Sequence, residues 1–168
     1  MGESDRASSV SSGVMGKHIA YTDGGARSNP GPAGIGFVLQ RVTDGTHEDI
    51  LDAGAFIGET TNNVAEYYAL IWALENALHL DIDDIEVRSD SLLVVSQVRG
   101  EWKIKQEHLR LLCVRATSLG RQFERFTIVH IPREENERAD MYANMAMDEG
   151  RTVGNYAVEP ELDAISLF

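Results

Sequence analysis

The hydrophobic period of the chain changes at residue 61, and this change restricts the possible folds more than any other feature. Before it, the stretches 17–23, 35–41 and 50–57 are predicted strands, and polar or Gly- and Pro-rich segments join them. After it, apolar side chains recur every three or four residues over 65–78, which predicts a helix capped by Thr61 or Asn62. Three strands with short links favour an antiparallel meander, on which the following helix packs.

The rest of the chain alternates short strands with helices. We predict strands at 85–89 and 123–131, and helices at 92–98, 108–119 and 135–148. This order predicts an α/β fold, in which helices flank a mixed five-stranded sheet. The segment 24–34, GGARSNPGPAG, is predicted to be a turn throughout. We assign residues 1–16 to a disordered lead, 17–149 to one folded domain and 150–168 to a C-terminal tail.

The charge of the chain is unevenly distributed. The 168 residues include 27 Asp and Glu but only 15 Lys and Arg, a formal charge of −12 that by itself disfavours a nucleic-acid partner. Between Arg88 and Arg138, however, the sequence has ten basic and seven acidic residues, so one surface of the protein can be basic. The single Cys113 excludes an internal disulfide and any cysteine-cluster metal site.

Two absences bear on the cellular location. No apolar run reaches the roughly 20 residues of a membrane helix, and the first residues lack the apolar core of a signal peptide. We therefore expect a cytoplasmic protein without a membrane partner. Because no feature demands a dimer, we also expect a monomer.

Four carboxylates lie at the ends of predicted elements, where they can converge at one edge of a sheet. Asp23 ends the first strand, Glu66 lies in the first turn of the first long helix, Asp90 follows the fourth strand, and Asp140 lies one turn into the last helix. Such a group would bind hard divalent cations, Mg²⁺ above all, because its members repel one another without them. Capping preferences alone could also place acids at these positions, so both interpretations stay open here.

Four segments carry a family resemblance: YTDGGARSNPGPAGIGFVL, TTNNVAEYYALIWAL, VRSDSLLVVSQVRGEW and HIPREENERADMYANMAM. In this order they resemble the successive signature blocks of type 1 ribonuclease H, and the resemblance covers about residues 17–149. The chain is most similar to the short form found in archaea and actinobacteria, which lacks a basic protrusion.

The resemblance implies a ribonuclease H-like fold with the sheet order 3-2-1-4-5. It also implies endonucleolytic cleavage of the RNA strand of RNA–DNA hybrids by two-metal-ion catalysis, which leaves 5′-phosphate and 3′-hydroxyl ends. Asp23, Glu66, Asp90 and Asp140 would be the catalytic carboxylates that bind two Mg²⁺ ions, with Mn²⁺ as a possible substitute. All four are present, so the sequence shows no sign of an inactive homologue.

Several polar residues match family positions that contact the hybrid. Asn29, Asn62 and Asn63 would hydrogen-bond it, and Thr61 would help to bind a DNA-strand phosphate, although capping of the helix is an alternative for Thr61 and Asn62. Gly24 and Gly25 either let the RNA backbone approach closely or form a plain hairpin turn. These expectations concern the following substrate-binding residues: Gly24, Gly25, Asn29, Thr61, Asn62 and Asn63.

Two segments depart from the pattern of many bacterial relatives. Only GEWKIKQEH stands where these relatives carry an extra helix and a basic handle, so we expect weaker hybrid binding. Trp102, Lys103 and Lys105 would supply a residual basic and aromatic surface, unless Trp102 packs on its own domain. In the shortened loop IPREEN, Arg133 replaces the usual His as an auxiliary group that attracts phosphate.

The C-terminal residues DAISLF resemble a short peptide that docks onto the sliding clamp, and packing of the tail on its own domain is the alternative. Two other functions compete with the leading one. A hybrid-binding protein that cleaves poorly would share the fold, and the missing handle motivates this alternative. An integrase or a junction resolvase would share the carboxylates but lack the DGG and NNVAEY blocks.

Overall fold

A six-stranded mixed sheet forms the centre of the protein. The computed structural model describes residues 16–162. The predicted lead, except for residue 16, and the predicted clamp-binding residues 163–168 lie outside this range. The strand order is β5-β4-β1-β2-β3-β6, in which β1, β4 and β5 run parallel and the other neighbours pair antiparallel. The strands are β1 (Lys17–Ala26), β2 (Gly31–Thr43), β3 (Thr46–Thr60), β4 (Asp84–Ser89), β5 (Arg125–His130) and β6 (Val153–Asn155).

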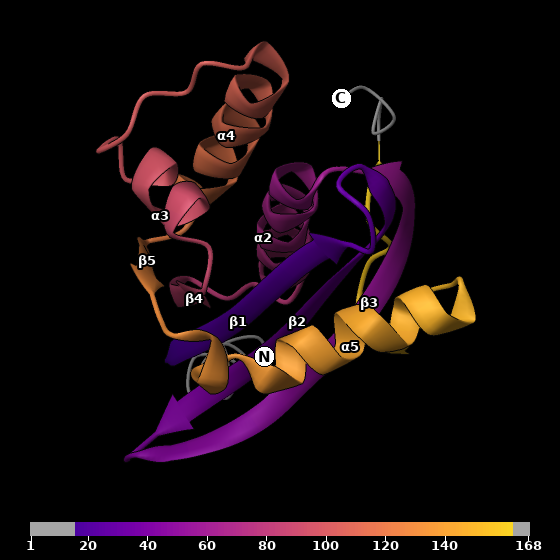
Figure 1. The fold of residues 1–168 in the computed structure, drawn as a ribbon. Coiled ribbons are helices and arrows are strands. Elements are labelled where there is room, and N and C mark those ends of the chain that lie inside the picture. Colours follow the sequence, from indigo (N-terminus) through magenta and orange to yellow (C-terminus); the bar gives the residue numbers. More distant parts are fainter. Residues whose placement is uncertain (1–15, 163–168) are drawn as a thin grey trace.

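Helices cover both faces of this sheet (Figure 1). The long helix α2 packs on one face, and α5 lies across the other, over β2 and β3. The helical elements are α2 (Asn62–His79), α3 (Leu92–Val98), α4 (Glu107–Gly120), the 3-10 turn η1 (Arg133–Glu135) and α5 (Glu137–Glu149). No helix of residues 16–162 has both the length and the apolar character needed to span a bilayer.

The predicted class and the order of the first five strands are confirmed, with two differences in detail. A sixth strand, β6, pairs with β3 at Asp52–Gly54, and its three residues are too few to show a period. The prediction that all of 24–34 forms a turn is wrong, because β1 continues to Ala26 and β2 already begins at Gly31. The four glycines of this segment, at positions 24, 25, 31 and 34, therefore lie inside paired strands.

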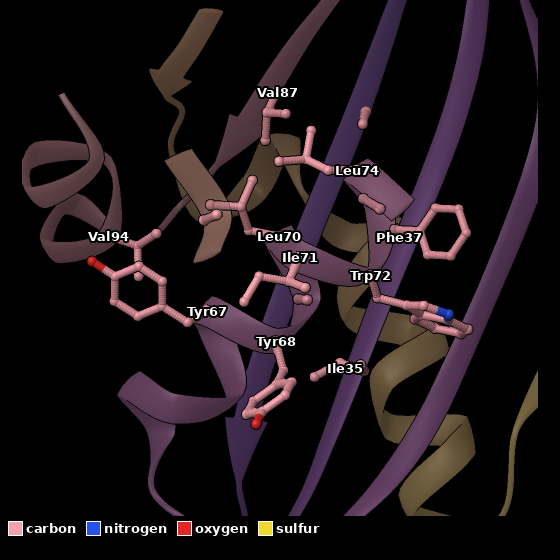
Figure 2. Packing of buried hydrophobic residues seen from close by; sticks show 14 of the residues in the cluster. Ile35, Phe37, Tyr67, Tyr68, Leu70, Ile71, Trp72, Leu74, Val87 and Val94 are labelled. Atoms are coloured by element: carbon pink, nitrogen blue, oxygen red, sulfur yellow. The ribbon is translucent and has the colours of Figure 1, made fainter. Parts of the chain in front are cut away.

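The main core lies between α2 and the sheet. Trp72 of α2 meets Phe37 of β2 edge to face, with ring centroids 4.9 Å apart (Figure 2). The segment after β6 packs on the same helix. The Trp72 Nε1–H donates to the Val158 carbonyl at 2.7 Å, and Tyr156 contacts the Trp72 ring. Asn76, which is fully buried, accepts the backbone N–H groups of Ala157 and Val158.

Glycines in the strands bring both helices close to the sheet. A Cβ atom at Gly36 of β2 would lie 2.2 Å from the Ala139 carbonyl oxygen of α5. On the other face, a Cβ atom at Gly24 of β1 would lie 2.4 Å from the Ala65 carbonyl oxygen of α2. Because only glycine permits such an approach, these two positions set how near α5 and α2 come to the end of β1.

Candidate active site

The end of β4 lies beside the middle of β1, and this adjacency places two carboxylates together. Thr22 pairs with Ser89 in parallel register, so Asp90 leaves the sheet beside Asp23. The prediction that Asp23 ends the first strand is wrong, because Asp23 pairs with Gly36 inside β1, which continues to Ala26. Glu66 comes from α2. The sequence predicted it in the first turn of this helix, but it is the fifth residue. Asp140 is the fourth residue of α5.

Three of the four predicted carboxylates form a compact group. Asp23, Glu66 and Asp90 each offer one oxygen such that all three oxygens lie within 4.8 Å of one another. The backbone N–H of Gly24 donates to Glu66 Oε1 at 3.1 Å and so holds that side chain against β1. Asp140 lies outside this group of three, but it is near enough to help raise the pKa of Asp23.

The electrostatics of the group are unfavourable without a cation. Burial, followed by the neighbouring charges of Asp90 and Asp140, raises the pKa of Asp23 to about 9. Burial and the charges of Asp23 and Asp90 likewise raise the pKa of Glu66 well above its usual range, while Arg133 opposes this shift. A divalent cation such as Mg²⁺ would offset the repulsion among these hard oxygen donors, so the group fits such an ion.

An open cleft of about 370 Å³ surrounds these carboxylates. Arg133 of η1 lines it, so the shortened loop places this guanidinium beside the acidic group, as the sequence predicts. Arg27 and Asn144 also line the cleft, and neither was singled out from the sequence. The detectable signal for Asn144 was its place four residues after Asp140, on the same face of α5.

The predicted substrate-binding asparagines join the β1–β2 turn to the start of α2. Asn29 Oδ1 accepts the backbone N–H of Asn62 at 3.0 Å, and Asn62 Oδ1 accepts the backbone N–H of Ala26 at 2.7 Å. Thr61 Oγ1 accepts the Val64 N–H, so Thr61 is the N-cap and the alternative cap Asn62 is wrong. The Asn63 side chain has no hydrogen-bond partner within residues 16–162.

The alternative interpretation of Gly24 and Gly25 as a hairpin turn is wrong. Both lie inside β1, where Gly24 pairs with Ile35 and Gly25 with Gly34. At Gly24 the absence of a side chain serves the packing of α2. Their predicted approach to an RNA strand stays a prediction.

The segment 99–106 forms a short connection between α3 and α4, without the extra helix of handle-bearing relatives. Trp102 is 48% exposed, so its packing on its own domain is at most partial. Lys103 and Lys105 are exposed beside it. The three side chains are therefore available as the predicted basic and aromatic surface.

Comparisons with known proteins agree with this geometry. The family described as "Reverse transcriptase-like" matches residues 21–146. Ribonuclease HI of Halobacterium salinarum is 47% identical over 134 residues, which cover 80% of this chain and 66% of that protein. A ribonuclease H of Chromohalobacter salexigens is 32% identical, with 91% of this chain and 98% of that protein covered.

Solved structures give the same result. The crystal structure of RNase H1 from Halobacterium salinarum superposes with a TM-score of 0.75 at 47% identity, covering 80% of this chain and 99% of that one. LC11-RNase H1, solved in complex with an RNA/DNA hybrid, superposes with a TM-score of 0.73 at 45% identity, covering 79% and 98%.

The lengths of the relatives differ. The chain spans about two thirds of the Halobacterium ribonuclease HI, and 36% of a bifunctional protein of Mycobacterium tuberculosis to which it is 44% identical. The family match nevertheless covers most of this chain, and the match to the Chromohalobacter enzyme spans nearly that whole protein. The chain therefore belongs to the type 1 ribonuclease H family, in its short archaeal and actinobacterial form.

Proposed function

We propose that the protein is an endoribonuclease that hydrolyses the RNA strand of RNA–DNA hybrids. The observation that carries this proposal is the group formed by Asp23, Glu66 and Asp90, whose oxygens lie within 4.8 Å of one another in an open cleft. A relative that is 45% identical was solved in complex with an RNA/DNA hybrid, which supports the same substrate here.

The four carboxylates would hold two Mg²⁺ ions, with Asp140 completing the set beside Asp23. When bound, the ions would activate the attacking water and stabilise the departing 3′ oxygen, so that the products carry 5′-phosphate and 3′-hydroxyl ends. Mn²⁺ would serve as a substitute ion, since it accepts the same oxygen ligands.

The other residues of the cleft would bind and orient the substrate. Arg133 carries a permanent positive charge next to the carboxylates, which suits the attraction of a phosphate and the release of product. The side-chain oxygens of Asn29 and Asn62 already accept backbone N–H groups. Their NH₂ groups would therefore donate to 2′-hydroxyls or base edges of the hybrid. Thr61 and Asn63 extend this polar surface along the start of α2.

The experiment that tests the proposal compares four end-labelled substrates: an RNA–DNA hybrid, single-stranded RNA, double-stranded RNA and duplex DNA. We expect Mg²⁺-dependent cleavage of the RNA strand of the hybrid alone, with no cleavage when EDTA is present. Binding of the hybrid without cleavage, under Mg²⁺ or Mn²⁺ at low and high salt, would instead favour the hybrid-binding protein. The preferred ion, the monomeric state, the cytoplasmic location and docking onto the sliding clamp stay predictions.

A further inference from the structure

Asn144 contacts the exposed member of the carboxylate set. It lies one helical turn after Asp140 on α5, and its Nδ2 group donates to the Asp140 carbonyl oxygen at 3.0 Å and to Asp140 Oδ1 at 3.2 Å. One amide therefore bonds both the backbone and the carboxylate of the same residue.

Arg27, in the β1–β2 turn, fixes the orientation of this amide. Its guanidinium donates to Asn144 Oδ1 and to the Asn144 carbonyl oxygen, both at 3.3 Å, and pairs with Asp148 at 2.7 Å. A guanidinium has no acceptor, so the atom of Asn144 that faces it must be the oxygen. The NH₂ group of Asn144 is thereby directed to Asp140.

The four carboxylates differ in how they are held. Asp23 is buried within β1, and Glu66 accepts the Gly24 N–H. Asp140, by contrast, is exposed on the surface of α5, where an aspartate side chain is otherwise free to change rotamer. A group that restrains it therefore has a larger effect at this position than at Asp23 or Glu66.

We propose that Asn144 is a positioning residue that fixes the Asp140 carboxylate for metal binding. This inference rests on the proposed function, in which Asp140 is a metal ligand. Partners of metal ligands orient the ligand, and their loss commonly lowers metal affinity or activity by about 10- to 100-fold.

The test uses Asn144→Ala in the full chain, with Asn155→Ala as the matched control. Asn155 also donates to an aspartate, Asp52, at 3.2 Å, but it lies on β6 outside the cleft. We expect Asn144→Ala to raise the Mg²⁺ concentration for half-maximal cleavage about tenfold, while KM for the hybrid at saturating Mg²⁺ stays within about twofold. Asn155→Ala should leave both quantities unchanged.

A second readout is independent of cleavage. Binding of Mn²⁺, measured by electron paramagnetic resonance on the protein alone, should weaken in Asn144→Ala and in Asp140→Asn. In a double variant, the Asn144 substitution should add less than about twofold to the effect of Asp140→Asn, because it acts through that carboxylate.

The inference would be overturned if Asn144→Ala weakened Mn²⁺ binding equally in the wild-type background and in the Asp140→Asn background. Wild-type Mn²⁺ binding and Mg²⁺ dependence in Asn144→Ala would also overturn it, and so would an Asp140→Asn variant with unchanged metal binding. If the wild-type protein fails to cleave the hybrid, the proposed function fails, whereas the Mn²⁺ measurement still tests the role of Asn144.

Discussion

A methyl group at Gly36 should separate α5 from the sheet and displace Asp140 from the other carboxylates. The Cβ atom of Gly36→Ala would lie 2.2 Å from the Ala139 carbonyl oxygen and 2.8 Å from the Ala143 nitrogen, where contact begins at about 3.4 Å. Both neighbours are backbone atoms and cannot rotate away. The helix must therefore retreat by about 1 Å, and Asp140, the next residue after Ala139, moves with it.

The expected cost has two parts. Overpacking of this kind destabilises a protein by about 1–3 kcal/mol, which corresponds to a decrease in Tm of about 3–10 °C for a chain of this size. A displacement of about 1 Å at a reacting centre costs on the order of 100-fold in rate. Activity should therefore fall much further than the loss of folded protein explains.

The assay measures thermal unfolding and, well below the Tm, the initial rate of cleavage of a labelled RNA–DNA hybrid. Gly16→Ala is the control, because a Cβ atom at Gly16 meets nothing within 4 Å, and its rate and Tm should equal those of the wild type. A Gly36→Ala variant with wild-type Tm and rate would refute the reasoning that the backbone contact of α5 positions Asp140.

Two further predictions concern the carboxylate group and the tail. The raised pKa of Asp23 means that the folded, metal-free protein holds a proton, which the unfolded chain releases above about pH 4. The free energy of unfolding should therefore fall as the pH rises from 7 to 9 in EDTA. Asp23→Asn should reduce this fall in thermal unfolding experiments, and an identical fall in both proteins would contradict the proposed burial of a protonated Asp23. Asn76→Ala removes the acceptor of the Ala157 and Val158 N–H groups and should cost about 1–3 kcal/mol in chemical unfolding, with hybrid cleavage at 25 °C retained. An unchanged unfolding free energy would show that the tail does not stabilise α2.

The fold was predictable where the local pattern and the family blocks agree. The start of α2 is marked by Thr61, and strand β4 ends just before Asp90, so both elements and their carboxylates were expected in place. The strand order of the first five strands followed as well. The ends of these elements depend on residues that are close together in the sequence, whereas the strand order was implied by the family resemblance.

Other features depend on residues that are distant in the sequence, and these were missed. Gly34 suggests a turn when read locally, but it lies in β2, where α5, about a hundred residues later, packs on it. The bond between Arg27 and Asn144 joins residues 117 positions apart.

The salt dependence of hybrid binding follows from the distribution of charge. The net charge of −12 opposes association with a polyanion. The short 99–106 segment offers Lys103 and Lys105 beside Trp102, and its third basic residue, Arg99, pairs with Glu101. Because each neutralised phosphate adds to the salt dependence of binding, the affinity for hybrid should fall less steeply with salt than in handle-bearing relatives.

The most direct test of the central claim compares the wild type with Asp23→Asn in two measurements on one labelled hybrid. Cleavage in Mg²⁺ reports on the carboxylate group, and a shift in electrophoretic mobility in EDTA reports on hybrid binding. We predict that Asp23→Asn abolishes cleavage of the RNA strand while its affinity for the hybrid stays within a few-fold of the wild-type value. Cleavage at the wild-type rate by Asp23→Asn would contradict the claim that this carboxylate group is the catalytic centre.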